Sequence, residues 1–371
     1  MKHRHFRVAA PAAAVLSLFV SCCSPFASSE SEGPLLVMSW NVLSLFDPID
    51  DGSEYSGFSV AKGSWGEAKY RGRIEAIGKV VLGVRPSAPS GPPGPDILCL
   101  VEIEKKSILE DLAKGPLAKC GYRWSAFAKV EGSPIGLGIL SRLPMEAARA
   151  WGLDVGGRGR ERPILEALFS RSGRPFAILL NHWKSKLEGA EATEASRIES
   201  ARLLSSVAGA AKASSPGLAI VACGDFNEGP TEHELAGRRY ATAFMPVGAA
   251  DAFSGSIGLA GRRSLSAVAG LASASSPGPG PAGFVAFSPW DDSDEYSYVH
   301  RGVRERIDGF VLSPDLLDGE GLEYRAFRVL KKGLVDEEGV PIPWSNATAK
   351  GWSDHLPILL ELSAMGVAEN S

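Results

Sequence analysis

Short apolar runs of strand length recur along most of the chain. Eight of them predict buried strands, at 35–40, 96–101, 137–141, 164–169, 176–181, 218–223, 307–313 and 357–362. Between them, apolar residues at helical spacing predict helices at 68–82, 107–113 and 192–211. Because strands and helices are mixed over the whole length, the pattern predicts a single α/β sandwich.

The N-terminal residues have the pattern of an export signal. Basic residues precede an apolar run at 8–20 that is too short to span a bilayer as a helix. The run ends at Ser21-Cys22-Cys23, which resembles the lipobox of bacterial lipoproteins. We therefore expect a signal peptide over 1–21, lipidation at Cys22 and a flexible tether over 22–33. A plain signal peptide cut near Ala27 is the alternative.

The remaining chain is expected to form one domain, 34–363, with a short tail at 364–371. Two segments rich in Pro, Gly, Ser and Ala, at 85–95 and 254–283, are expected to be surface insertions. The domain contains Cys99, Cys120 and Cys223, an odd number without the spacing of a metal site. Because Cys99 and Cys223 lie in apolar runs, we expect both to be buried free thiols.

The composition is that of an ordinary globular protein, with 44% hydrophobic and 22% charged residues. The formal net charge is −4. A protein that holds a phosphate backbone by its net charge is normally basic. Any phosphate chemistry in this chain therefore has to depend on a metal ion or on local positive charge.

Polar side chains with catalytic potential stand at the ends of the apolar runs, where a sheet delivers side chains to one rim. They are Asn41, Glu102, His182, Asp225, Asn227, Asp308, Asp354 and His355. Carboxylates, carboxamides and imidazoles without cysteine make a hard, oxygen-rich set of the kind that Mg²⁺ or Mn²⁺ prefers. The pattern predicts a divalent metal site that holds a phosphate.

Six short blocks contain these residues, in the order WNVLSLFD (40–47), PDILCLVE (95–102), NHWKS (181–185), GDFN (224–227), RID (306–308) and SDH (353–355). In sequence and order they resemble the endonuclease/exonuclease/phosphatase superfamily, whose fold is that of pancreatic-type deoxyribonuclease. The resemblance runs from about residue 35 to 362. It implies a four-layer α/β sandwich, in which two packed, mostly antiparallel sheets are flanked by helices.

The resemblance also implies a role for each matching residue. Glu102 is expected to be the main metal ligand, with Asn41 and Asp354 completing or supporting the site. Asp225 is expected to orient or deprotonate the attacking water, and Asn227 to hold that water and a phosphate oxygen.

The two histidines are expected to act from opposite sides of the phosphate. His355 is the histidine that pairs with Asp308, which favours its protonated form. His182 is expected to donate to a non-bridging oxygen or to the leaving group. Together these roles imply in-line attack of water on a phosphoester.

Three basic residues are weaker candidates for contacts to substrate phosphate. Arg160 and Arg162 resemble an arginine of the family that contacts phosphate, and a surface salt bridge is an equal alternative. Lys184 lies beside His182 and is expected to line the phosphate site, with a solvated loop as the alternative.

The resemblance implies metal-dependent phosphoric-ester hydrolysis and leaves the substrate open. Because the blocks at 40–47 and 181–185 resemble extracellular nucleases, the first hypothesis is a Mg²⁺- or Mn²⁺-dependent nuclease acting on DNA or RNA, with Ca²⁺ as a supporting ion. The second is a phospholipase C or sphingomyelinase-like enzyme or another phosphoesterase, for which 284–290 is the only candidate for a membrane contact. The third is a catalytically silent surface binding module. We expect an exported bacterial lipoprotein, anchored in a membrane and monomeric, with no protein partner.

Overall fold

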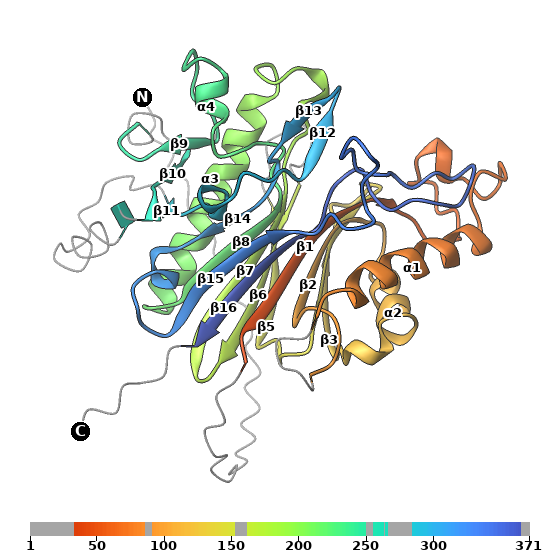
Figure 1. Cartoon of the computed structure of the whole chain (residues 1–371), viewed down its shortest axis with the longest axis horizontal. Helices are drawn as coiled ribbons and strands as arrows, with labels where there is room; N and C mark the ends of the chain where they lie inside the picture. Colours follow the sequence, from red (N-terminus) through yellow and green to blue (C-terminus); the bar gives the residue numbers. More distant parts are fainter. Residues whose placement is uncertain are drawn as a thin grey trace, which may run out of the picture. The chain divides into compact units, whose positions relative to one another are not determined.

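A computed structural model describes residues 33–85, 91–152, 162–249, 255–262, 264–265 and 284–364. Within these residues, the first of two large sheets, called sheet A here, has six strands (Figure 1). In spatial order they are β15 (Leu322–Val329), β16 (Ile358–Ala364), β1 (Leu35–Leu45), β2 (Ile97–Ile103), β4 (Gly136–Ser141) and β3 (Trp124–Ala128). The β1–β2 pair is parallel and the other neighbours are antiparallel.

The second large sheet, sheet B, has five strands in the described residues. In spatial order they are β14 (Asp308–Leu312), β8 (Ala219–Asp225), β7 (Arg174–His182), β6 (Ile164–Arg171) and β5 (Ala147–Trp151). Here β7 and β8 are parallel, and the other neighbours are antiparallel. Both sheets are therefore mostly antiparallel, as predicted.

The main core lies between the two sheets. Strand β1 shows how the alternation of side chains builds it, because Leu35 and Val37 join a cluster that includes Ile178 and Val221 of sheet B. Leu36 and Met38 of the same strand belong to a different cluster, on the outer face of sheet A. Both faces of β1 are thus buried, which explains its continuous apolar run.

Helices cover the outer faces of both sheets (Figure 1). Helices α1 (Glu67–Leu82) and α2 (Lys106–Lys114) pack on the outer face of sheet A, and α3 (Glu194–Ser214) packs on sheet B. The predicted four-layer sandwich is confirmed. A short helix, α4 (Glu232–Leu235), follows β8.

Two small sheets complete the described fold. One pairs β9 (Phe244–Pro246), β10 (Ile257–Leu259) and β11 (Val285–Ala286), and the other is a hairpin of β12 (Tyr298–His300) and β13 (Val303–Glu305). The prediction of a surface insertion over 254–283 is wrong for its described part, because Ile257 and Leu265 are buried in apolar clusters. The surrounding Gly and Ser obscure these apolar positions in the sequence.

Some sequence predictions lie outside the described residues. These are the signal peptide over 1–21, the tether over 22–33 apart from Gly33, the lipidation site Cys22, and the tail beyond Ala364. Residues 86–90 of the other predicted insertion also lie outside. Among the helices that are described, none combines the length and the apolar character needed to cross a membrane.

Gly224 permits a close approach between β7 and β8 next to Asp225. Its φ is 129°, and a Cβ at this position would overlap the backbone carbonyl oxygen of Asn181. Gly217 is a matched control, because it also has a positive φ, 80°, but a Cβ there would meet no atom within 4 Å.

We expect Gly224→Ala to lower the free energy of unfolding by about 3 kcal/mol and Gly217→Ala by about 1 kcal/mol. Chemical denaturation of both variants measures the difference. Equal losses would show that the contact with Asn181 does not constrain the strand pair.

Candidate active site

The sequence pattern predicted that Asn41 and Glu102 stand at the ends of their strands. In the structure both residues lie within their strands, at irregular points. The parallel register runs from Asn41 opposite Val101 to Leu45 opposite Ile103, so the ladder is interrupted between these pairs. Glu102 has a φ of 67°, a left-handed conformation that is costly for a residue with a side chain. The interruption directs the Glu102 carboxylate into the cavity described below.

The Glu102 carboxylate is held through both of its oxygens, more firmly through one of them. The backbone N–H and the hydroxyl of Ser44 both donate to Oε2, each at 2.9 Å. Oε1 accepts a single hydrogen bond, from Asn41 Nδ2 at 3.2 Å. A carboxylate oxygen accepts more than one bond, so Oε1 can still coordinate a cation.

Strand β8 of sheet B brings Asp225 to the same place. Asn41 Nδ2 donates to Asp225 Oδ2 at 3.0 Å, so this amide joins carboxylates of both sheets. The backbone N–H of Asn227 donates to Asp225 Oδ1 at 2.9 Å, and Asn227 Nδ2 donates to the Trp183 carbonyl oxygen at 3.2 Å. The GDFN block is therefore the end of β8 and the start of the following loop, and it orients two candidate catalytic side chains.

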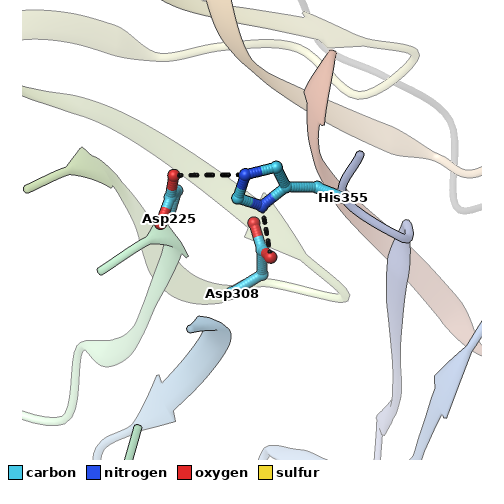
Figure 2. Close-up of side chains that lie close together, drawn as sticks. All are labelled: Asp225, Asp308 and His355. Atoms are coloured by element: carbon cyan, nitrogen blue, oxygen red, sulfur yellow. Dashed lines mark hydrogen bonds and ion pairs between the residues drawn. The ribbon is translucent and has the colours of Figure 1, made fainter. Parts of the chain in front are cut away.

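His355 and Asp308 form a buried dyad (Figure 2). His355 Nδ1 lies 2.8 Å from Asp308 Oδ2, and its Nε2 lies 4.0 Å from Asp225 Oδ2. Burial lowers the pKa of His355, but the charges of Asp308 and Asp225 together raise it well above the ordinary value. His355 is therefore an imidazolium that points its Nε2–H toward Asp225.

Asp225 itself is a weak acid in this setting. Burial raises its pKa to about 6, with the charge of His355 opposing and that of Asp308 adding to the shift. Such a carboxylate is ionised at neutral pH and is still basic enough to accept a proton.

His182 lies beside Glu102 and Asp225 and has the other protonation state. Its Nε2 is 3.7 Å from Glu102 Oε1 and 3.7 Å from Asp225 Oδ2. Burial, together with the charges of Arg162 and His355, holds the pKa of His182 well below its ordinary value. The site thus combines a neutral and a cationic imidazole.

Asp354 lies at the edge of the same site, with its side chain 36% exposed. The loop that carries it is tied to β1 through Ser353. The Ser353 hydroxyl donates to the backbone oxygen of Asn41 at 2.7 Å and accepts from the His355 N–H at 3.1 Å. The C-terminal SDH block is thereby fixed against the first strand of sheet A.

The structure brings all eight predicted catalytic and metal residues together around one cavity of about 670 Å³. Two of them stand behind its wall: Asp308 lies behind His355, and Asn41 lies between Glu102 and Asp225. The other six line the cavity directly, namely Glu102, His182, Asp225, Asn227, Asp354 and His355.

The structure separates the three predicted phosphate contacts. Arg162 lines the cavity and donates to the Trp183 carbonyl oxygen at 2.8 Å. Lys184 does not line it, and its ammonium instead pairs with Glu188 at 2.5 Å. Lys186, two residues further along the same loop, lines the cavity in its place. Arg160 lies outside the described residues.

Two supporting residues were missed by the sequence analysis. Ser44 holds Glu102 as described above, and Arg73 of α1 donates to the backbone oxygens of Val42 and Trp352. Arg73 is almost fully buried, which lowers its pKa to about 9. An arginine on the apolar face of a predicted helix was the available signal for it.

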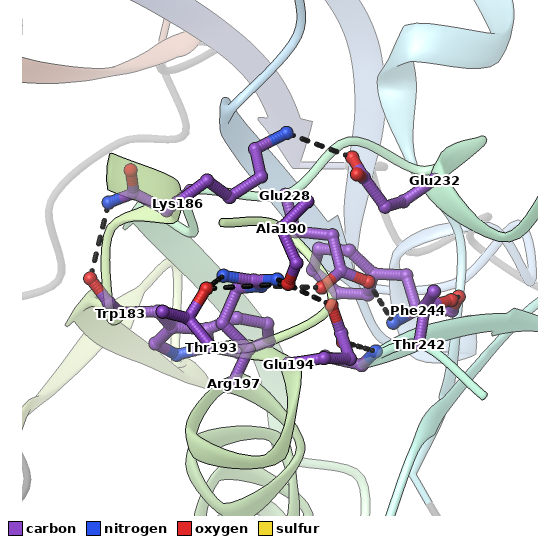
Figure 3. A network of polar contacts seen from close by, with 12 residues as sticks. Trp183, Lys186, Ala190, Thr193, Glu194, Arg197, Glu228, Glu232, Thr242 and Phe244 are labelled. Atoms are coloured by element: carbon purple, nitrogen blue, oxygen red, sulfur yellow. Dashed lines mark hydrogen bonds and ion pairs between the residues drawn. The ribbon is translucent and has the colours of Figure 1, made fainter. Parts of the chain in front are cut away.

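A buried polar network supports the turn after β8 (Figure 3). Arg197 of α3 is fully buried and donates to Glu194 at 2.5 Å and to Glu228 at 3.1 Å. Glu228 in turn accepts from the Phe244 N–H at 2.8 Å. Because Glu228 directly follows Asn227, this network fixes the backbone on which Asn227 is carried.

The donor set around Glu102 fits a hard divalent cation. Glu102, Asp225 and Asp354 offer carboxylate oxygens, which suit Mg²⁺ or Mn²⁺. Asn41 supports the site without offering its oxygen, because Oδ1 accepts from the Leu43 N–H at 3.0 Å and Nδ2 donates to Glu102. A second set of potential ligand atoms, from Asp225, Asp308 and His355, lies within 4.8 Å of one another. His355 Nδ1 is already paired with Asp308 Oδ2 at 2.8 Å, and Asp308 lies behind the cavity wall. The Glu102 side is therefore the better metal site.

We expect the imidazole of His355 to titrate above 6.5 in the metal-free protein and at a clearly lower pH after Asp308→Asn, because the variant loses the charge and the hydrogen bond of Asp308 and keeps the charge of Asp225. In the wild type, the His355–Asp308 pair contributes fully to the free energy of unfolding below pH 6.5. This contribution is lost as the pH rises through the pKa of His355 in the native protein. NMR titration of the histidines measures both values. Asp315→Asn, which removes a carboxylate paired with Lys212, is the control. A wild-type pKa below 6.5 would contradict the assignment of charge.

Comparison with known proteins agrees with this geometry. A model of the Endonuclease/Exonuclease/phosphatase family matches residues 36–245, more than half of the chain. A search of curated protein sequences gives no match.

Several solved structures have a similar fold. Truncated TDP2 of Caenorhabditis elegans is 15% identical with a TM-score of 0.52, and the alignment covers 89% of this chain and 98% of that one. TDP2 of D. rerio, complexed with a single strand DNA product, is 14% identical with a TM-score of 0.51 and coverage of 90% and 100%. An endonuclease/exonuclease/phosphatase family protein from Bacteroides thetaiotaomicron is 16% identical with a TM-score of 0.50 and coverage of 90% and 98%. At these identities the likeness concerns the fold, whereas the family match identifies the chain as a member of the endonuclease/exonuclease/phosphatase family, the metal-dependent phosphoric-ester hydrolases.

Proposed function

We propose that the protein is a Mg²⁺-dependent nuclease that hydrolyses phosphodiester bonds of DNA or RNA by in-line attack of water. The observation that carries the proposal is the meeting of Glu102, Asp225 and the two differently charged histidines in one cavity. A carboxylate-rich side for a metal ion then faces an imidazolium across the space that a phosphate would fill.

Glu102 and Asp354 would hold the metal ion, and Asn41 would support the site by donating to Glu102. When bound, a divalent ion at this place supplies positive charge to the phosphate oxygens. The Ser44 hydrogen bonds keep the Glu102 carboxylate in position for it.

The chain's own residues supply the remaining steps. Asp225, with its pKa of about 6, accepts the proton of the attacking water. The His355 Nε2 lies 4.0 Å from Asp225 Oδ2, which is too long for a hydrogen bond and leaves this donor available to a phosphate oxygen. Neutral His182 donates from the other side, to a non-bridging oxygen or to the leaving group. Asn227 helps to hold the water.

Two observations favour nucleic acid over a lipid substrate. The similar TDP2 structure from D. rerio contains a single strand DNA product. In addition, the segment 284–290, the candidate for membrane contact, is not an exposed aromatic hairpin: Phe287 and Trp290 are 0% and 2% exposed and belong to the core between the sheets. A phospholipase C or sphingomyelinase-like activity is therefore the second candidate.

The proposal is tested by measuring hydrolysis of four substrates, each with Mg²⁺ and with a chelator. The substrates are plasmid DNA, RNA, sphingomyelin and a chromogenic phosphodiester. We expect metal-dependent cleavage of the nucleic acids and of the small diester. Glu102→Gln keeps the shape of the side chain and removes its charge, so it should raise the Mg²⁺ concentration for half-maximal activity by about tenfold or more. If the protein releases phosphocholine from sphingomyelin and leaves DNA and RNA intact, the proposal that it is a nuclease is wrong. Normal activity of Glu102→Gln at low Mg²⁺ would remove Glu102 from the metal site.

We also propose that the enzyme acts outside the cytoplasm, anchored through a lipid on Cys22. The apolar run at 8–20 and the Ser21-Cys22 pair support this location. In expressing bacteria the wild type should enter the detergent phase on phase partitioning, and Cys22→Ser should move it to the aqueous phase. Cys23→Ser is the control and should behave like the wild type. Recovery of the wild type in the aqueous phase would contradict the anchor.

A further inference from the structure

One wall of the cavity is the β12–β13 hairpin. Its strands pair Tyr298 with Glu305 and His300 with Val303, so Arg301 and Gly302 form a two-residue turn. Both turn residues have positive φ values, 49° and 80°, as the tightest hairpin turns require. The hairpin therefore presents the side chains near its tip in a defined arrangement.

The hairpin has two different faces. Tyr298, His300 and Arg301 line the cavity. Arg304, on the returning strand, does not line it, and its guanidinium lies over the Tyr296 ring at 4.6 Å. A row of three rings connects the reaction centre to the tip on the cavity side. The Tyr298 ring centroid lies 4.7 Å from that of His355 and 6.4 Å from that of His300, and the Tyr298 and His300 rings are nearly parallel at 11°.

The positive charges that line the cavity differ in whether they are already neutralised. Lys186 pairs with Glu232 at 3.0 Å and with Glu305 at 2.9 Å (Figure 3 shows the first of these). In contrast, Arg301 is exposed and makes no hydrogen bond or ion pair with any other residue in the described ranges. A guanidinium without a carboxylate at a cavity edge is free to bind a phosphate, which it can grip with two donors.

Resting on the nuclease function proposed above, we infer that the hairpin binds a nucleotide next to the scissile phosphate, with its base on the His300 ring and its phosphate at Arg301. The substrate class that this arrangement takes is single-stranded or otherwise unpaired nucleic acid. In a duplex the faces of each base are covered by its neighbours, so only an unstacked base can lie on a protein ring. A choline headgroup fits less well, because it would bring a second cation to Arg301.

The test compares two substrates in each variant. Values of kcat and KM are measured for a single-stranded oligonucleotide and for a small chromogenic phosphodiester that cannot reach the hairpin tip. In Arg301→Ala and His300→Ala, kcat/KM for the oligonucleotide should fall about tenfold or more relative to that for the small diester, mainly through KM. His300→Phe retains a ring and should restore most of the loss. Arg304→Ala, on the other face of the hairpin, should behave like the wild type on both substrates.

The wild type should also cleave the single strand faster than the same sequence as a duplex. Three results would overturn the inference without contradicting the proposed nuclease activity. The first is an unchanged ratio of kcat/KM for the oligonucleotide to that for the small diester in Arg301→Ala and His300→Ala. The others are an equal effect of Arg304→Ala and a preference for the duplex. A wild type that hydrolyses the small diester but neither oligonucleotide would overturn the nuclease itself. Circular dichroism melting of each variant shows that the changes in rate do not come from unfolding.

Discussion

The amide of Asn41 joins the two sheets at the point where their charges meet. Its Nδ2 donates to Glu102 of sheet A and to Asp225 of sheet B, at 3.2 and 3.0 Å. Carboxylates this close repel each other in a partly buried place, so the arrangement needs positive charge nearby. Imidazolium His355 supplies part of it from the Asp308 side, and a divalent cation beside Glu102 would supply the rest. The reactivity of the site follows from this concentration of like charge.

Keeping these groups in place requires backbone conformations that are unfavourable by themselves. Leu43, Ser44, Glu102 and Asn227 all have positive φ values between 50° and 67°. Such conformations cost free energy and persist only where the surroundings determine them. Here the Arg73 hydrogen bonds to the β1 and Trp352 backbones and the Arg197 network behind Glu228 provide the support. The site is therefore held in shape by contacts from outside it and not by local backbone preference.

The sequence predicts the fold well where burial is complete and less well elsewhere. Strands such as β7 and β8 are apolar on both faces and are visible as continuous runs. Strand β5 was missed because it is short and largely exposed, and β15 because polar residues alternate along it. The described part of 254–283 was misinterpreted because its buried residues stand among Gly and Ser, which carry no periodic signal.

The same distinction applies to the site. The eight principal residues were recognisable because each lies beside an apolar run and the blocks keep a characteristic order. Which neighbour of His182 faces the cavity depends on the path of an irregular loop, so Lys184 was expected where Lys186 lies. The left-handed conformation of Glu102 and the inward position of Arg73 depend on contacts between segments distant in sequence, which no local pattern contains.

The proposed chemistry requires one divalent ion beside Glu102, in the cavity that Asp225 and His355 also line. A crystal structure grown with Mn²⁺ measures this directly through the anomalous signal of the metal. We expect a peak beside the Glu102 carboxylate, at the distance of direct coordination. A peak instead at the other acidic cluster, formed by Asp51, Glu54 and Glu104, with none beside Glu102, would contradict this expectation.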